Sequence, residues 1–408
     1  MRSIGGRAVA RTEAVESVER IELLPLAVLC LVVLLIYAST YLLLAVLPIH
    51  IRALVGSEST VGTIMSLFSL AALLVRPFAG LLSDRVGRRP SIFAGALLIG
   101  ASCVGYAVAG AHTIFLARIL NGLGWGAVTA ATATVAADLA PPSRRGFVLG
   151  IYGTVTGLAL AVGPAAGTWL AGRLSLTTTF GIAAACGFGA AAGILLLHAP
   201  SPPRPASSRF GLHHLFTRQA LGPAAIMLCF TLMYGTVLTF IPLYAIDRHL
   251  GSSGPFFSVF AVVLIVMRVT GGRLSDRWGR FAVIAPGFVF AGAAMVLLAG
   301  AQQRALLLLA AVLFAVAFAL VQPAAQAWAV DRSPAELRGT TLSTVVAAQD
   351  LGISLGTVAA GFTADAVGYG GLFLALTAVA VVGLAAAWLV FRATGQPLRA
   401  ARPGAGRA

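Results

Sequence analysis

Four ionisable side chains lie inside long apolar stretches of the sequence: Arg76, Arg118, Arg268 and Asp350. A charge at the centre of a membrane-spanning helix costs at least about 2.5–3.5 kcal/mol, so such residues usually mark a proton relay or a substrate pathway. Asp350 is the only acid deep in such a stretch, ~15 Å from the nearer end at about 1.5 Å per helical residue. Burial away from water disfavours the charged form of a carboxyl group, so that the group can bind and release a proton more readily. Asp350 is therefore a candidate for proton coupling or substrate contact, and pairing with an arginine is the alternative.

The three buried arginines divide into a symmetric pair and a single residue. Arg76 and Arg268 each lie eight residues before an aspartate, Asp84 and Asp276 respectively. Their symmetry favours a shared structural role near an inner gate. Arg118 opens the segment RILNGLGWG and has no such counterpart. It is a second candidate for proton coupling, although it lies near enough to the outer boundary to extend its guanidinium outward.

Uncharged polar and aromatic side chains in the same stretches are candidates for a substrate cavity: Tyr37, Tyr41, Asn121, Trp125, Tyr152, Tyr234, Gln322, Gln326 and Gln349. For any one aromatic ring, helix packing or anchoring at the membrane interface is the simpler interpretation. The histidines are at helix ends or in a linker, and the four cysteines are scattered singly. No metal site and no cofactor are expected.

These residues must be positioned by membrane-spanning helices. The chain of 408 residues is 59% hydrophobic and only 10% charged, whereas soluble domains carry about 25% charged residues. A spanning helix needs about 20 mostly apolar residues. Twelve segments meet that length: 24–49, 60–82, 91–110, 113–137, 147–172, 175–197, 219–246, 255–274, 282–301, 304–330, 340–364 and 370–391. We therefore expect an all-α integral membrane protein.

The basic residues are distributed asymmetrically between the two sides of the membrane. All 28 are Arg, which excludes the phosphate-binding loop that needs Lys and so argues against an ATP-driven pump. With the N-terminus inside, 21 arginines fall in cytoplasmic segments and four, Arg52, Arg173, Arg248 and Arg304, fall outside. The positive-inside rule then places both termini in the cytoplasm. Because the arginines form no stripe interleaved with aromatic residues, no nucleic-acid partner is expected.

The spans divide into two bundles. We expect a cytoplasmic N-terminal tail at 1–22, a six-helix bundle at 23–198, a linker rich in Pro, Ser and Arg at 199–218, a second six-helix bundle at 219–392 and a basic cytoplasmic tail at 393–408. Such a linker is typical of a connection between two domains.

An internal repeat relates the two bundles. A shift of 192 residues superimposes Ser66, Phe68, Arg76, Gly80, Leu82, Ser83, Asp84, Arg85, Gly87 and Arg88 on Ser258, Phe260, Arg268, Gly272, Leu274, Ser275, Asp276, Arg277, Gly279 and Arg280. A shift of 193 superimposes Asp138, Arg145, Gly146 and Gly163 on Asp331, Arg338, Gly339 and Gly356. Parallel repeats of this kind place the substrate site between the halves, near the midplane.

The loop GLLSDRVGRR resembles the signature loop of the major facilitator superfamily, and its residues Gly80, Asp84, Arg85, Gly87, Arg88 and Arg89 fill that pattern without a gap. The second copy departs only at Phe281. The resemblance implies that Asp84 caps helix 11 and that Asp276 lies at the start of helix 5 by symmetry. It also implies that Arg85 or Arg88 pairs with Asp138, and that Arg277 and Arg280 lie near Asp331, as latches that close the cytoplasmic side. Enforcement of topology alone is the alternative role for these arginines.

Two further segments resemble elements of exporters in that family. Gly157, Gly163, Pro164 and Gly167 partly match its antiporter motif, with Ala159 and Thr168 in place of two glycines. Arg118, Gly122 and Gly124 match an element linked to proton coupling.

We therefore expect a monomeric secondary transporter of a bacterial inner membrane that alternates access and expels a drug-like molecule or small metabolite in exchange for protons. An importer or uniporter of a small organic solute, anionic because three buried arginines outnumber one aspartate, is the first alternative. A receptor or scaffold without transport is the second. An enzyme is not expected, because no nucleophile–base pair or cofactor loop occurs.

Overall fold

The computed structural model describes residues 23–141, 144–197, 217–334 and 337–394, and within these it leaves out the side chains of 80–82, 84–85, 268–273 and 276. The expected tails and most of the expected linker lie outside the described residues. In the described part every regular element is a helix. Among the described residues, ten helices are long and apolar enough to span a membrane, and a shorter apolar one covers Gly254–Met267. One of the ten, α13, is two helices in succession, and the shorter helix adds one more span. The described part therefore contains the twelve expected spans.

The helices follow one another with short connections. Their bounds are α2 Leu23–Leu42, α3 Leu47–Val55, α4 Glu58–Val86, α5 Arg88–Val108, α6 Ile114–Asp138, α7 Arg145–Arg173, α8 Leu176–Ile194, the short 3-10 helix η3 Arg218–Ala220, α9 Leu221–Asp247, α10 Gly254–Trp278, α11 Arg280–Gly300, α12 Arg304–Asp331 and α13 Arg338–Thr394. The first expected span is α2 and α3 together, separated by a short turn before Pro48.

At three places in the chain, one glycine is the whole connection between a helix and the next one. Gly87 joins α4 to α5 with φ 109° and ψ 156°, and Gly279 joins α10 to α11 with φ 92° and ψ 159°. Gly368 interrupts α13 with φ 70° and ψ 175°, which divides it into helices at 338–367 and 369–394. This region of backbone space is open essentially only to glycine. The tight turn expected at Gly87 and Gly279 is confirmed, whereas the turn at Gly368 replaces an expected short loop.

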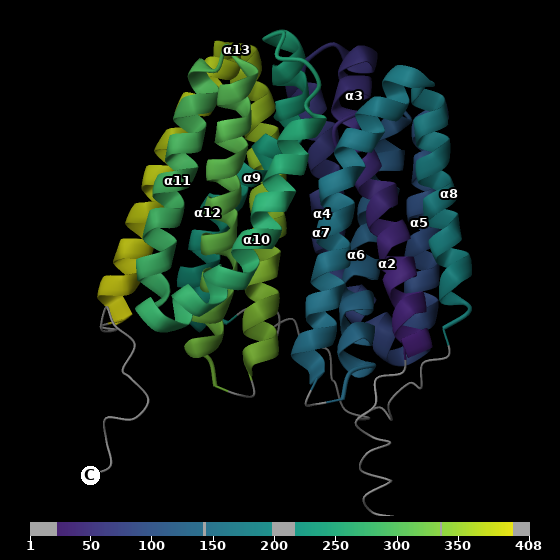
Figure 1. Ribbon diagram of the computed structural model, residues 1–408, viewed down its shortest axis with the longest axis horizontal. Helices are drawn as coiled ribbons and strands as arrows, with labels where there is room; N and C mark the ends of the chain where they lie inside the picture. Colours follow the sequence, from purple (N-terminus) through teal and green to yellow (C-terminus); the bar gives the residue numbers. More distant parts are fainter. Residues whose placement is uncertain (1–22, 142–143, 198–216, 335–336, 395–408) are drawn as a thin grey trace, which may run out of the picture.

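The helices form two groups that stand side by side (Figure 1). We call α2–α8 the N-half and η3–α13 the C-half. Two ends are also distinguished: the α3 end, which carries α3 and the turns at 56–57 and 248–253, and the linker end, which carries 139–141, 217–220 and 332–334. The α3 end is at the top of Figure 1, where the ribbons of the two halves meet; a gap separates them at the bottom.

Small residues allow the halves to touch near the α3 end. A side chain added at Gly62 on α4 would overlap the carbonyl oxygen of Thr357 on α13, and one added at Gly361 would overlap that of Glu58. On the other side of the bundle, a Cβ at Gly254 on α10 would lie 2.7 Å from the Cα of Ala165 on α7. Glycine and alanine let membrane helices approach this closely. The pairs α4–α13 and α7–α10 therefore form the boundary between the halves.

Candidate functional site

Arg76 and Asp350 form an ion pair that crosses this boundary. Arg76 lies on α4 and Asp350 on α13, 12 residues after the start of that helix at Arg338. The Nε of Arg76 donates to Oδ2 of Asp350 at 2.6 Å, and Nη2 lies 3.4 Å from Oδ1. Asp350 is only 5% exposed. Asp350 is thus paired with an arginine, which is the alternative given for it above. The partner, Arg76, is a residue for which we expect a structural role near the inner gate.

The pair joins two opposite charges, with the Asp350 side chain 7% exposed and the Arg76 side chain 24% exposed. A charge-assisted bond of this geometry is short and strong, but removal of one partner leaves the other charge buried and uncompensated. Nη1 of Arg76 also points toward Thr129 Oγ1 on α6, at 3.4 Å. Protonation of Asp350 would therefore weaken one specific contact between the halves and leave Arg76 attached to the N-half.

Arg118, the other coupling candidate, is placed away from this pair. It is 9% exposed, and its guanidinium carbon lies 4.5 Å from the ring centroid of Phe68. Its Nη2 lies 3.5 Å from the carbonyl oxygen of Met65, and its Nε has no partner. Arg118 is thus held between α6 and α4 inside the N-half by a cation–π contact. It has no acidic partner of its own among the described ion pairs.

The N-half gathers four aromatic rings beside these charges. Trp125 on α6 lies 4.8 Å from Tyr37, 6.1 Å from Tyr41 and 5.8 Å from Phe68, measured between ring centroids. Such separations are those of favourable aromatic pairs. The structure therefore brings three of the predicted cavity residues together. Phe68 was missed, although the repeat that aligns it with Phe260 was a signal.

A chain of hydroxyl groups borders the same rings. Tyr37 Oη lies 3.3 Å from Tyr152 Oη, which lies 3.1 Å from Thr132 Oγ1. These bonds link α2, α7 and α6. Thr132 and Thr129 were also missed, because a threonine bonded to its own helix gives no pattern in the sequence.

The candidate cavity residues of the C-half lie in less polar surroundings. Tyr234 on α9 lies among Phe260, Phe314 and Phe318, with ring centroids at 6.2, 6.5 and 4.7 Å. Gln322 on α12 donates its amide to Oε1 of Gln349 on α13 at 3.1 Å. Gln326 is half-buried one helical turn after Gln322.

Asn121 does not belong to this set. It is 2% exposed, and its Nδ2 donates to Ser102 Oγ on α5 at 2.8 Å. Its amide therefore stabilises the packing of α6 on α5, and the assignment of Asn121 to the cavity is corrected. A buried amide needs such a partner, since leaving it unpaired is costly.

The predicted latches at the linker end tie helices within one half. Arg88 at the start of α5 pairs with Asp138 at the end of α6, and Arg280 Nε lies 2.8 Å from Asp331 Oδ2 in the equivalent place of the C-half. Arg89 Nε donates to the carbonyl oxygen of Ile194 on α8 at 3.1 Å. The expected pairings of Arg88 with Asp138 and of Arg280 with Asp331 are thus present, and each joins two helices of the same half. The side chains of Asp84, Arg85 and Asp276, and the position of Gly80, lie outside the described part; Arg277 is exposed.

The expected helix-5 motif lies on α7, at two different contacts. A side chain at Gly167 would overlap the carbonyl oxygen of Leu42, and a Cβ at Gly163 would lie 2.7 Å from Cβ of Tyr41, both on α2. Gly157 faces the other half, where a Cβ would lie 3.0 Å from Ile265 on α10. Pro164 lies inside the helix, next to the close approach to α2.

An unpredicted polar contact joins the halves at the α3 end. Asp365 on α13 accepts hydrogen bonds from the backbone N–H groups of Glu58 at 3.0 Å and Ser59 at 2.9 Å, at the start of α4. A carboxylate there satisfies unpaired donors and complements the helix dipole. Glu58 in turn pairs with Arg52 at 3.0 Å.

Comparisons with known proteins agree on one family. A family model described as Major Facilitator Superfamily matches residues 29–357 and 256–407. The Staphylopine export protein of Staphylococcus aureus (strain Mu50 / ATCC 700699) is 23% identical over 86% of this chain and 92% of its own length. An uncharacterised MFS-type transporter of Burkholderia mallei (strain SAVP1) is 27% identical over 87% and 89%. A bacterial homologue of the human lysosomal transporter Spinster, solved inward-facing and unoccupied, has a TM-score of 0.76 at 16% identity and covers 93% of this chain and 98% of its own.

Proposed function

The chain belongs to the major facilitator superfamily, and on that premise we propose that it is a proton-coupled exporter of a drug-like molecule or small metabolite. It acts by alternating access, with the N-half and the C-half rocking about a substrate that binds between them. The arginine distribution supports a cytoplasmic location of both termini. In that orientation the α3 end faces outward, in the plasma membrane of a bacterium, and a monomer suffices.

The ion pair between Arg76 and Asp350 is the observation that carries the proposal. It is the one ion pair between the halves among the described residues, and one proton abolishes it, because a neutral carboxyl group no longer attracts the guanidinium as an ion. Protonation of Asp350 at one membrane face would favour separation of α4 from α13. Its deprotonation at the other face would restore the pair.

The aromatic cluster supports a drug-like substrate. Trp125, Tyr37 and Tyr41 offer flat apolar surface next to the hydroxyl groups of Tyr152 and Thr132. Binding sites for small organic molecules combine such apolar walls with a few polar groups. Export, as opposed to import, is supported by the partial antiporter motif on α7 and by the named activity of the Staphylococcus aureus relative.

The test is transport of ethidium by proteoliposomes under an imposed pH gradient. Asp350→Asn should abolish transport driven by the gradient, because the amide cannot exchange a proton, while counterflow of ethidium at equal pH persists. The matched control is Asp138→Asn, which neutralises an acid of similar size that pairs within one half. Undiminished gradient-driven transport by Asp350→Asn would refute the coupling role.

The alternative is import or facilitated passage of a small organic anion. It is favoured by the charges described inside the spans, where the two arginines Arg76 and Arg118 outnumber the one acid, Asp350. Counterflow with p-aminohippurate against tetraphenylphosphonium separates the two proposals. Preference for the anion would replace the drug exporter by this alternative.

A further inference from the structure

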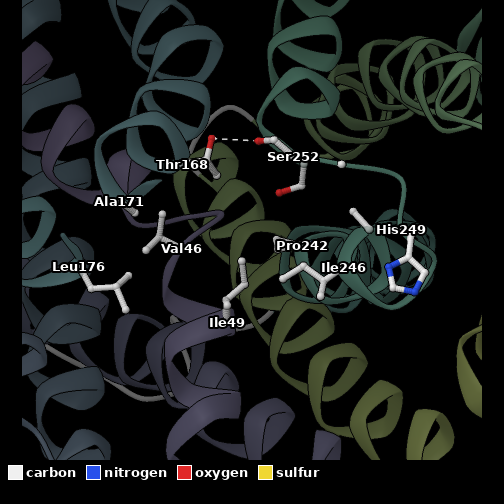
Figure 2. Close-up of a pocket in the computed structure, with 12 residues that line it drawn as sticks. Val46, Ile49, Thr168, Ala171, Leu176, Pro242, Ile246, His249 and Ser252 are labelled. Carbon is white, nitrogen blue, oxygen red and sulfur yellow. Dashed lines mark hydrogen bonds between the residues drawn. The ribbon is translucent and has the colours of Figure 1, made fainter. Parts of the chain in front are cut away.

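A cavity of about 530 Å³ opens at the α3 end, where the halves meet (Figure 2). The N-half contributes lining residues from α3, α7 and α8, and the C-half contributes the end of α9 and the loop at 249–253. Cavities of a few hundred cubic ångströms hold small organic ligands. Neither Arg76 nor Asp350 lines the cavity, and no residue of the aromatic cluster (Tyr37, Tyr41, Phe68 and Trp125) does.

The lining is apolar along its sides and polar along the loop. Val46, Ile49 and Leu176 lie on one side in Figure 2, and Pro242 and Ile246 lie on the other. None of the residues that line it is Asp, Glu, Lys or Arg, and His249 is its one ionisable side chain. Leu176 and Ile246 are 37% and 48% exposed, so the apolar surface continues to the outside of the bundle.

The polar side contains an unused hydrogen-bonding group. Ser253 lines the cavity and is 3% exposed, and its Oγ has no partner. The neighbouring Ser252 donates to Thr168 Oγ1 of the other half at 3.2 Å (Figure 2). A buried hydroxyl without a partner costs free energy that a ligand oxygen would recover.

The loop is shaped by the way α9 ends. His249 has φ 53°, and Leu250 N donates to the carbonyl oxygen of Ala245 at 2.8 Å. These are features of a helix terminus with a left-handed residue after its last turn, a place usually taken by glycine. The turn directs the loop at 249–253 back over the end of α9 toward α7.

We propose that this cavity binds a neutral lipid-like amphiphile, with an aliphatic chain along the apolar sides and a hydroxyl or carbonyl oxygen at Ser253. The occupant comes from the surrounding membrane, because the apolar lining is continuous with exposed Leu176 and Ile246 at its rim. A ligand that contacts both halves is bound only while they are together at this end. By mass action it therefore favours the conformation closed at the α3 end.

Photolabelling tests the site, with full-length protein in proteoliposomes and a decanol that carries a diazirine in mid-chain as the probe. Labels should concentrate on peptides that contain Ile49, Ala171 and Ile246, and unlabelled decanol or dioctanoylglycerol should displace them. Decanoate should compete about tenfold less well, since no basic lysine or arginine in the lining compensates its charge. Labels spread evenly over lipid-facing helices would overturn the proposal. Displacement by ethidium but not by dioctanoylglycerol would overturn it too, by assigning the cavity to the exported solute.

Two variants make the test specific. Ala171→Trp fills the cavity and should remove the labels, whereas Leu174→Trp adds the same side chain at an exposed position outside the lining. Ser253→Ala should weaken labelling about three- to tenfold, the effect of one hydrogen bond. If Ala171→Trp does not fold, Ser253→Ala decides, and unchanged labelling of that variant refutes the site. With decanol near its Kd, amide exchange at 46–52 and 248–253 should slow in the unaltered protein and slow clearly less in Ser253→Ala at the same decanol concentration.

Discussion

The guanidinium of Arg76 meets the carboxylate of Asp350 across the boundary between the two halves, with Nε 2.6 Å from Oδ2. The two residues are 274 positions apart in the chain. They belong to non-equivalent helices of the repeat, since α4 is the second helix of its half and Asp350 lies on the fifth of the other. Each charge is compensated only while α4 and α13 stay together at this level.

The pair predicts strong non-additivity in stability. Asp350→Leu or Arg76→Met alone should lower the free energy of unfolding by about 3–5 kcal/mol, because each leaves one charge inside the bundle without its partner. The double variant Arg76→Met, Asp350→Leu should lose far less than the sum, since both charges are then gone. Thermal unfolding in detergent measures all three. Additive losses would show that the two side chains do not interact.

The contact of Asp365 with α4 predicts an effect confined to the α3 end. Asp365→Asn removes a charged cap from Glu58 and Ser59 and should cost about 0.5–2 kcal/mol. Amide hydrogen exchange should quicken at 58–62 and stay unchanged at the linker end. Thr363→Val is the control, because Thr363 is half-buried on the same helix and its hydroxyl donates to the carbonyl oxygen of Ala359 one turn earlier. Equal exchange in both variants would argue against an inter-half role.

Close packing of α7 on α2 predicts opposite effects at two glycines. Gly167→Ala would overlap Leu42 and should lower the free energy of unfolding by at least about 1–3 kcal/mol. Gly150→Ala, on the same helix with open space around it, should raise it by about 0.5–1 kcal/mol. Thermal melting of the two purified variants provides the comparison. A Gly167→Ala protein as stable as the original would mean that α7 can withdraw from α2 at no cost.

The aromatic cluster predicts a defect in substrate affinity. Trp125→Ala removes the ring shared by Tyr37, Tyr41 and Phe68, and should raise the KM for ethidium about tenfold, the loss of one or two aromatic contacts. Trp169→Ala removes a ring that is 61% exposed on α7 and should leave KM unchanged. Similar KM values in the two variants would remove Trp125 from the binding surface.

The spans and their order could be read from the sequence because apolar length is a local property. So could the turns at Gly87 and Gly279, which only glycine allows. The ion pairs of Arg88 with Asp138 and of Arg280 with Asp331 were accessible as well, since the repeat placed each arginine and acid in register. Their residue numbers also place both members of each pair within one of the expected bundles, 23–198 or 219–392.

The partner of Asp350 could not be derived in the same way. Hydrophobic pattern shows that a charge is buried, but which arginine it meets depends on how α4 and α13 face each other. The prediction that Asn121 lines the cavity was wrong for a related reason. A polar residue in a span can point to a cavity or to a neighbouring helix, and Asn121 donates a hydrogen bond to Ser102 on the neighbouring helix. Asp365 gave no signal, because its partners are backbone N–H groups of a helix distant in the chain.

The single-glycine junctions at 87, 279 and 368 limit how this protein can move. A connection with one residue has just two soft backbone torsions, so neighbouring helices such as α4 and α5 have no spare chain with which to slide past each other. We therefore expect the two helices of each joined pair to move together. Sliding of α4 past α5, or of α10 past α11, is thus opposed by the length of the connection, and under the proposed alternating access we expect these pairs to tilt together.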